Sequence, residues 1–202
     1  MSLVQTIAPD EEPVSLEEAK AHCRVESDFV EDDDQIAAYI AAARESCEAV
    51  TGRQLVSATY VLRLSSFPCG DVIELPRPPL VSVSSIAYVD VDGATQTLST
   101  DVYEMDAYTT PGRVVLKYGQ TWPSVRAQRN AVTITYVAGY GGAEDVPKLL
   151  KQGMLMRIAH WHENHEDTAP VNLLPVPSGA AYCDGLYKVM GRLNIDELGR
   201  NE

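Results

Sequence analysis

The residues best suited to chemistry in this sequence form a histidine-rich run, His160-Trp161-His162-Glu163-Asn164-His165-Glu166. On a helix His162 shares a face with His165 and with Glu166, a spacing compatible with a metal site. The zinc-hydrolase signature requires two histidines four positions apart, whereas His162 and His165 are three apart. Outside the run the sequence has one further histidine, His22. The pattern therefore favours a helix end whose imidazoles interact with the helix dipole, and a metal-dependent hydrolase using His160, His162 and His165 is the alternative.

Two other patterns that could do chemistry lack necessary parts. Gly139-Tyr140-Gly141-Gly142 resembles a phosphate-binding loop, but no Lys-Ser/Thr pair follows it and Glu144 and Asp145 would repel phosphate. The four cysteines lie far apart, with no C-x-x-C pair, which is typical of reduced, buried thiols. There is also no G-x-S-x-G turn. The sequence therefore predicts no catalytic residue, no metal and no cofactor, and indicates a protein that is not an enzyme.

Negative charge is distributed unevenly along the 202 residues. The net charge of −13 divides into −10 for residues 1–50, zero for 51–143 and −3 for 144–202. The run Glu31-Asp32-Asp33-Asp34 lacks the alternating ligands and central glycine of a calcium loop, so it favours negative charge at a helix N-terminus. Because an acidic surface releases no counterions from DNA, adhesive DNA binding is disfavoured.

The sequence shows no sign of membrane insertion or export. Its apolar runs fall well short of the roughly 20 residues that a spanning helix needs. The segment Met1 to Asp10 has neither the basic start nor the apolar stretch of a signal peptide. A soluble protein made in the cytoplasm is expected.

Three helices are predicted. Ser15 and Glu18 form a capping box that begins a short helix reaching about Cys23. A second helix follows the acidic run and ends at Gly52. A third is expected to begin with Asp145 as its cap and to reach about Glu166. Their apolar faces are expected to be Ile36, Ile40, Ala43, Cys47 and Val50 for the second, and Leu149, Leu150, Met154, Leu155, Ile158, Ala159 and Trp161 for the third.

Between Leu55 and Tyr140 the apolar period changes from that of a helix to two. Runs of β-branched and aromatic residues alternate there with groups that form turns. About six or seven strands in an antiparallel sheet or small barrel are expected. The runs are 59–64, 71–75, 81–89, 102–105, 113–116 and 131–137.

The C-terminal part changes character again. Pro170, Pro175 and Pro177 make a continuous helix or central strand implausible and favour an extended arm. The fold class is therefore α+β. Residues 1–53 plus 144–167 are expected to form a helical core from an N-terminal helix pair packed with a long C-terminal helix. Residues 54–143 are the inserted antiparallel β domain, and 168–202 are the arm.

Several short sequence motifs, in the order in which they occur, resemble those of a phage head-to-tail connector (adaptor) family of long-tailed phages, prophages and gene transfer agents. The opening, from Glu12-Pro13-Val14-Ser15-Leu16 through Ala19-Lys20 to His22 and Val25, is similar to that family's "P-V-(T/S)-L-x-E-A-K-x-H-L-R-V", with Cys23 where leucine is usual. The resemblance extends from Asp10 to Glu166. Its further phrases are Asp33-Asp34-Gln35-Ile36, Ala41-Ala42-Ala43-Arg44, Thr51-Gly52-Arg53, Leu75-Pro76-Arg77-Pro78-Pro79-Leu80-Val81-Ser82-Val83, Pro111-Gly112-Arg113-Val114, Trp122-Pro123, Asn130-Ala131-Val132, Val137-Ala138-Gly139-Tyr140-Gly141, Val146-Pro147 and His160-Trp161-His162-Glu163-Asn164.

The resemblance implies a structural virion protein of the neck, assembled in the host bacterial cytoplasm. It implies a ring of ~12 copies between the portal and a stopper or tail-completion protein, with genomic DNA passing through the lumen without specific binding. Another neck or tail-completion protein is the nearest alternative. An acidic lumen would repel DNA, and its candidates are Glu31, Asp32, Asp33, Asp34, Glu144 and Asp145.

Contacts with other proteins are expected at two places. The sheet edges are candidates for contact between subunits, because an exposed edge invites strand pairing. The arm is a candidate for docking to the portal by ordering against it. Its apolar candidates are Leu173, Leu174, Tyr182, Leu186, Tyr187 and Met190.

Overall fold

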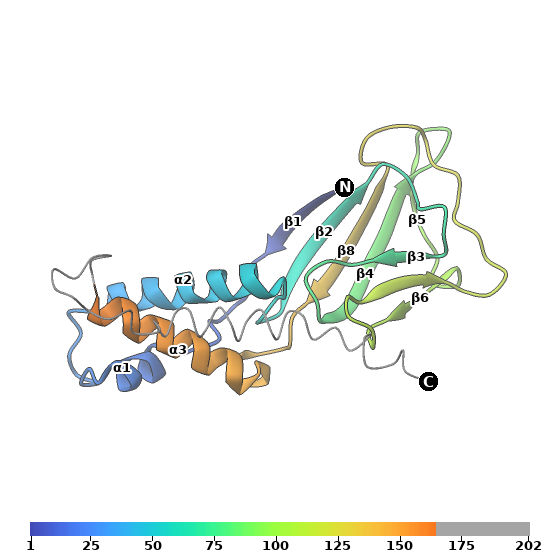
Figure 1. Ribbon diagram of the computed structural model, residues 1–202. Helices are drawn as coiled ribbons and strands as arrows, with labels where there is room; N and C mark the ends of the chain where they lie inside the picture. Colours follow the sequence, from blue (N-terminus) through green and yellow to red (C-terminus); the bar gives the residue numbers. More distant parts are fainter. Residues whose placement is uncertain (165–202) are drawn as a thin grey trace, which may run out of the picture. The chain divides into compact units, whose positions relative to one another are not determined.

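The computed structural model describes residues 1–164, which form two compact units (Figure 1). The helical unit comprises Asp10–Val56 and residues 141–164, and the sheet unit comprises Met1–Pro9 and Ser57–Tyr140. The α+β fold class is confirmed. The proposed arm, residues 168–202, lies outside the described residues.

The helical unit contains α1 (Leu16–Cys23), α2 (Asp33–Thr51) and α3 (Lys148–Glu163), each in contact with the other two. The capping box of α1 is confirmed. The Glu18 amide donates to Ser15 Oγ over 3.1 Å, and the Ser15 amide donates to Glu18 Oε2 over 2.9 Å. None of the helices in residues 1–164 has the length and apolar character required to cross a bilayer.

The predicted apolar faces form the core of this unit. Ile36, Ile40, Ala43 and Cys47 of α2 are buried, as are Leu150, Met154 and Ile158 of α3. Leu149 was expected on the same face but is exposed. Successive residues of a helix point about 100° apart, so Leu149 and Leu150 do not face the core together.

Both ends of α3 differ from expectation. Asp145 does not cap it: this residue closes a short 3₁₀ turn, Ala143–Asp145, and its Oδ2 accepts from the Gly142 amide over 3.1 Å. Pro147 precedes the first helical residue instead. At the other end the helix stops at Glu163, earlier than predicted, because Asn164 leaves the helical conformation.

The sheet unit has two antiparallel sheets, with strand orders β1-β2-β8-β4-β5 and β3-β7-β6. The predicted six or seven strands between Leu55 and Tyr140 are confirmed, since seven lie there. The strands are β1 (Ser2–Ile7), β2 (Ala58–Leu64), β3 (Val72–Glu74), β4 (Leu80–Val89), β5 (Thr95–Thr97), β6 (Tyr103–Asp106), β7 (Arg113–Leu116) and β8 (Val132–Ala138).

Two edge strands, β1 and β5, were not predicted from the sequence. Residues 1–9 were assigned to the helical core, but β1 pairs with β2 from Ser2↔Arg63 to Ile7↔Thr59. Both strands are almost entirely exposed, so neither shows the alternation of buried and exposed residues that identifies a strand in sequence. Pairing with the neighbouring strand, which depends on the tertiary structure, decides their conformation.

Aromatic residues pack among aliphatic side chains in the core of the sheet unit. Tyr136 of β8 is completely buried, stacks on Tyr60 at 5.8 Å and donates its hydroxyl to the Pro76 carbonyl over 2.8 Å. Burial raises the pKa of the Tyr136 phenol well above its usual value, so this donor is retained. Phe67 stacks on Trp122 at 4.9 Å, and the Trp122 indole donates to the Gly70 carbonyl over 2.8 Å.

Gly112 brings the two sheets of this unit together. A Cβ at this position would lie 2.3 Å from Cβ of the buried Leu80. Gly112→Ala is therefore expected to lower the free energy of unfolding by about 2 kcal/mol, the usual cost of overpacking. Gly70→Ala is the matched control, because a Cβ at Gly70 meets no atom within 4 Å. Urea denaturation of both variants measures the difference, and equal stability of the two would contradict the packing argument.

Candidate functional site

Lys20 of α1 holds the loop between α1 and α2 in place. Its ammonium donates to the carbonyls of Ser27 over 3.1 Å and Phe29 over 2.6 Å, and to Asp33 Oδ1 over 2.7 Å. An ammonium has three donors, and these contacts use all three. The Lys20 side chain is buried, so Asp33 supplies the balancing charge at the start of α2. Lys20 and Asp33 both belong to sequence motifs that carry the family resemblance.

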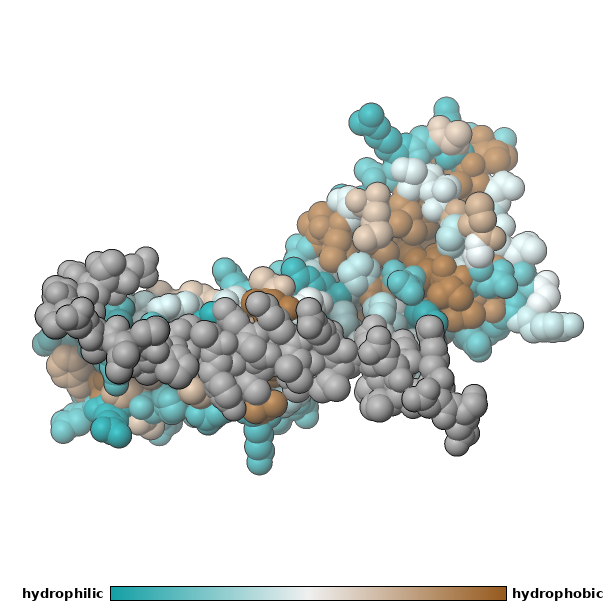
Figure 2. Space-filling model, viewed as in Figure 1, coloured by the Kyte–Doolittle hydropathy of each residue, from teal (hydrophilic) through white to brown (hydrophobic). Residues whose placement is uncertain are grey.

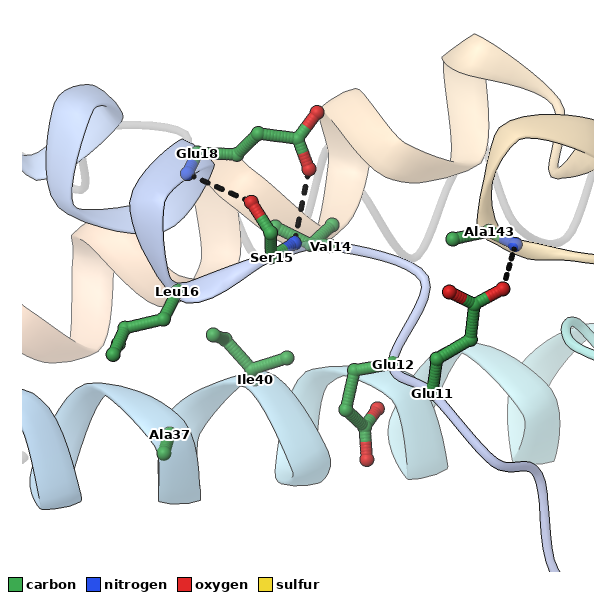
Figure 3. Close-up of a pocket in the computed structure, with 9 residues that line it drawn as sticks. All are labelled: Glu11, Glu12, Val14, Ser15, Leu16, Glu18, Ala37, Ile40 and Ala143. Atoms are coloured by element: carbon green, nitrogen blue, oxygen red, sulfur yellow. Dashed lines mark hydrogen bonds between the residues drawn. The ribbon is translucent and has the colours of Figure 1, made fainter.

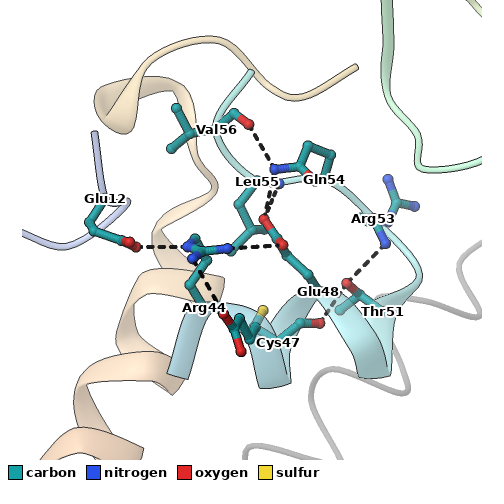
Figure 4. A network of polar contacts seen from close by, with 10 residues as sticks. Glu12, Arg44, Cys47, Glu48, Thr51, Arg53, Gln54, Leu55 and Val56 are labelled. Atoms are coloured by element: carbon teal, nitrogen blue, oxygen red, sulfur yellow. Dashed lines mark hydrogen bonds and ion pairs between the residues drawn. The ribbon is translucent and has the colours of Figure 1, made fainter. Parts of the chain in front are cut away.

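Arg44, in the middle of α2, joins the segment before α1 to α2 (Figure 4). Its Nε donates to Glu12 Oε2 over 2.8 Å, and its Nη1 lies 3.4 Å from Glu48 Oε2 one turn along the helix. Burial alone would lower the pKa of Arg44, but the hydrogen bond that Arg44 donates to Glu12 and the charges of Glu12 and Glu48 raise that pKa above its usual value. The guanidinium therefore links Glu12, in the segment before α1, to Glu48, on the next turn of α2.

Glu48 closes the other end of this network, where α2 ends (Figure 4). Its Oε1 accepts from Gln54 Nε2 over 2.9 Å and from the Leu55 amide over 3.2 Å. Glu48, Gln54 and Leu55 are all buried, so the carboxylate satisfies polar groups that water does not reach. The chain reverses at Gly52, whose φ of 69° is in the left-handed region that favours glycine.

An open groove of about 320 Å³ lies between the segment before α1 and the middle of α2 (Figure 3). Leu16, Ala37 and Ile40 supply apolar side chains to it. Its carboxylates are already in use: Glu11 accepts from the Ala143 amide over 2.7 Å, Glu12 binds Arg44 and Glu18 caps α1. Among the described residues that line the groove, none form the paired, reactive side chains that acid-base or nucleophilic catalysis needs.

The six proposed lumen carboxylates occupy two places in the helical unit. Four flank the start of α2: Glu31 and Asp34 are exposed, Asp32 is half-buried, and Asp33 binds Lys20. Asp32 is the N-cap residue, but its side chain makes no capping hydrogen bond, so the acidic run acts there through charge alone. Glu144 and Asp145 are exposed in the 3₁₀ turn before α3. The assignment of these six residues to a lumen stays a prediction.

The histidine run ends α3. The Asn164 amide donates to the His160 carbonyl over 3.0 Å, so a backbone donor satisfies this carbonyl at the end of the helix. Trp161 lies 6.0 Å from the Tyr39 ring and under the Arg157 guanidinium at 5.6 Å, which gives the run a packing role. Among residues 1–164, no group of three or more His, Cys, Asp or Glu side chains could hold a metal ion. His165 lies outside the described residues.

The remaining predicted interaction residues lie outside the described part of the chain. They are the apolar candidates for portal docking, Leu173, Leu174, Tyr182, Leu186, Tyr187 and Met190. Within residues 1–164, Cys23, Cys47 and Cys69 form no disulfide. Burial, with the charge of Glu163, raises the pKa of Cys23. A raised pKa makes this thiol a weaker nucleophile at neutral pH.

Comparison with known proteins bears directly on these contacts. Residues 13–99 match the family described as phage gp6-like head-tail connector protein. The predicted family resemblance is confirmed. The matched segment contains Lys20, Asp33, Arg44 and Glu48, so the charged residues that organise α1 and α2 lie in the part of the chain shared with the connector family. That family is one of structural connector proteins, which also confirms the expectation that the chain is not an enzyme.

Solved structures with the same fold support the comparison over a longer part of the chain. The neck of an empty gene transfer agent particle, computed with C6 symmetry, matches with a TM-score of 0.73 and 22% identity. The virion of a native gene transfer agent particle matches with a TM-score of 0.74 and 22% identity. The neck of a native particle computed with C12 symmetry has a TM-score of 0.73, again at 22% identity. Each match covers 93% of this chain and 95% of the other. No curated protein matches the chain.

Sequence reasoning missed the structural use of the charged family residues. In the sequence, Lys20 and Arg44 stand in motifs that resemble the connector family, and Glu48 contributes only to the net charge. In the structure each of them has a definite partner inside the helical unit. The helical period could have suggested the pairing of Arg44 with Glu48, since residues four apart share a face. The partners Glu12 and Gln54 lie outside the helix, where no periodicity identifies them.

Proposed function

We propose that the chain is a structural subunit of the neck of a phage-like particle, where it forms a ring of about twelve copies between portal and tail. The observation that carries this proposal is the connector-family match over residues 13–99, the segment whose charged side chains are used in internal ion pairs. The similar fold of neck structures determined with C6 and C12 symmetry supports a cyclic assembly.

The charge of the helical unit supports DNA passage through that ring. In its described residues, 16 Asp and Glu face 7 Lys and Arg, whereas the sheet unit has 7 against 6. A surface of this charge repels the DNA backbone within a Debye length of about 8 to 10 Å. In this proposal the exposed members of the six candidates, Glu31, Asp34, Glu144 and Asp145, line the lumen, and the DNA passes without being bound.

The proposed partners are the portal on one side and a stopper or tail-completion protein on the other. The portal contact is assigned to the arm, residues 168–202, because its prolines and apolar residues suit a segment that orders against another protein. Another position in the neck is the nearest competing function. A hydrolase using the histidine run has no support in the geometry of His160 and His162.

Electron microscopy of the purified full chain mixed with its portal protein tests this function. Closed rings of about twelve copies seated on the portal are expected, with the arm in contact with the portal. The same map reports whether Glu31, Asp34, Glu144 and Asp145 line the channel. A chain that stays monomeric and never joins the portal would contradict the proposal, and a ring at the tail end of the neck would support the tail-completion alternative.

A further inference from the structure

The five-stranded sheet has one edge that is little protected against strand pairing. Natural sheets protect their edges with charged side chains, prolines, bulges or very short strands. In the three-stranded sheet, both edge strands carry carboxylates, Glu74 on β3 and Glu104 and Asp106 on β6. In the five-stranded sheet, β5 is three residues long, and β4 beside it has two bulges. β1 is the least protected edge strand: it carries no charged residue or proline and has one bulge, between Gln5 and Ile7.

β1 is six residues long, and residues 1–9 contain no charged side chain. It lies at the end of the strand order, so among the described residues only β2 pairs with it (Figure 1). The pairing is regular from Ser2 to Gln5, and a bulge follows before Ile7. Val4 is 42% exposed and Ile7 59%. An uncharged strand of this length with one open side is a template for another strand.

The directions of the strands restrict which strand can complete it. Four antiparallel pairings separate β1 from β5, so these two edge strands run in the same direction. Pairing of β1 with β1 of a second copy by a two-fold axis would close a dimer and stop there. Pairing of β1 with β5 of a second copy uses two different edges, so it can repeat by rotation around a ring. A ring axis roughly along the strands would make that junction parallel.

The side chains at the two edges suit such a junction. Val4 is paired with Val61 of β2, and Thr97 is paired with Ala87 of β4. Because β2 and β4 both pair with β8, their registers place these four residues on the same face of the sheet. Val4, Thr95 and Thr97 carry no charge, so joining the edges would bury no unpaired ion. Figure 2 shows apolar residues beside weakly and strongly polar ones on the visible face of the sheet unit.

The hairpin between β4 and β5 holds the receiving edge in place. Asp90 Oδ1 accepts from the amides of Asp92 over 3.1 Å and Ala94 over 2.9 Å, and its Oδ2 accepts from Gln96 Nε2 over 2.9 Å. The hydrogen bond from Gln96 is the main reason why the pKa of Asp90 lies below its usual value. These bonds keep Thr95–Thr97 extended, with the side of β5 away from β4 open.

We propose that β1 of each copy adds to the β5 edge of the next copy, so that the five-stranded sheets continue from subunit to subunit around the ring. This inference rests on the ring of the proposed function and specifies its subunit contact. Because β5 has three residues, the junction is short. It sets the angle and register between neighbours and acts together with other contacts in stabilising the ring.

Disulfide cross-linking in rings assembled with the portal protein tests this contact. Val4→Cys is combined in the full chain with Thr95→Cys in one variant and with Thr97→Cys in another, because the register of a parallel junction fits one of the two. After mild oxidation one of these pairs is expected to give a ladder of covalent multimers up to the full ring. The matched control combines Val4→Cys with Tyr118→Cys, which is completely exposed but is not on this edge. The parent chain, with its native cysteines, is the second control.

Each outcome has a distinct meaning. Rings seen by electron microscopy without a ladder from either pair would overturn the edge contact and leave the ring in place. Covalent dimers from Val4→Cys alone would show that β1 pairs with itself, which also overturns it. Absence of rings in the parent chain would instead contradict the proposed function, and the edge contact with it.

A charge on the open edge provides a second readout without cysteines. Val4→Lys is expected to raise the concentration of protein needed for ring assembly at least tenfold, since edge lysines block strand pairing. Val72→Lys is the matched control: Val72 is 39% exposed, close to the 42% of Val4, but lies in the other sheet. Equal assembly of both variants and the parent chain, measured by mass photometry, would contradict the proposal.

Discussion

Lys20→Met is expected to lower the free energy of unfolding of the helical unit by about 3 kcal/mol, the usual cost of removing one partner of a buried ion pair. The change leaves Asp33 without its counter-charge and the carbonyls of Ser27 and Phe29 without their donor. Methionine keeps most of the length and apolar surface of the lysine stem, so the loss reports the ammonium contacts. Urea denaturation followed by helical circular dichroism measures it.

Lys148→Met is the matched control, because Lys148 is exposed at the start of α3, and a change within about 0.5 kcal/mol is expected there. Adding Asp33→Asn to Lys20→Met removes the unpaired carboxylate and should recover part of the lost stability. If Lys20→Met is as stable as the control variant, the ammonium does not organise the loop between α1 and α2.

Glu48→Ala is expected to destabilise the helical unit by about 2 to 3 kcal/mol, because it leaves buried polar groups unsatisfied. The Leu55 amide loses its acceptor, Gln54 Nε2 keeps only the Val56 carbonyl, and Arg44 loses one of its carboxylates. Glu48→Gln keeps a carbonyl oxygen that can still accept from the amide, so a smaller loss is expected from it. The same denaturation experiment compares the two variants.

Glu45→Ala is the control for charge alone. Glu45 also neighbours Arg44, at 3.8 Å, but its side chain is largely exposed, and exposed ion pairs contribute little to stability. Equal effects of Glu45→Ala and Glu48→Ala would show that net charge, and not the buried acceptor, stabilises the end of α2.

Local patterns of sequence determined the helices and most of the strands. The capping box at Ser15 and Glu18 needs only residues three apart, and the apolar face of α2 repeats with the helical period. Strands β2, β4, β7 and β8 show the β-branched composition of half-buried strands. The ordered phrases from Asp10 to Glu166 were sufficient to identify the resemblance to the connector family, which the match over residues 13–99 confirms.

Only the tertiary structure decided the features whose partners lie far apart in the chain. β1 is a strand because β2, over 50 residues away, pairs with it, and its own exposed residues show no period. Arg44 meets Glu12 across 32 positions, and Gly112 is required because Leu80 of the facing sheet occupies the place of its Cβ. Periodicity describes which face of an element is apolar, but not what lies against that face. The direction shared by β1 and β5, on which the proposed subunit contact depends, follows only from the order of strands in the folded sheet.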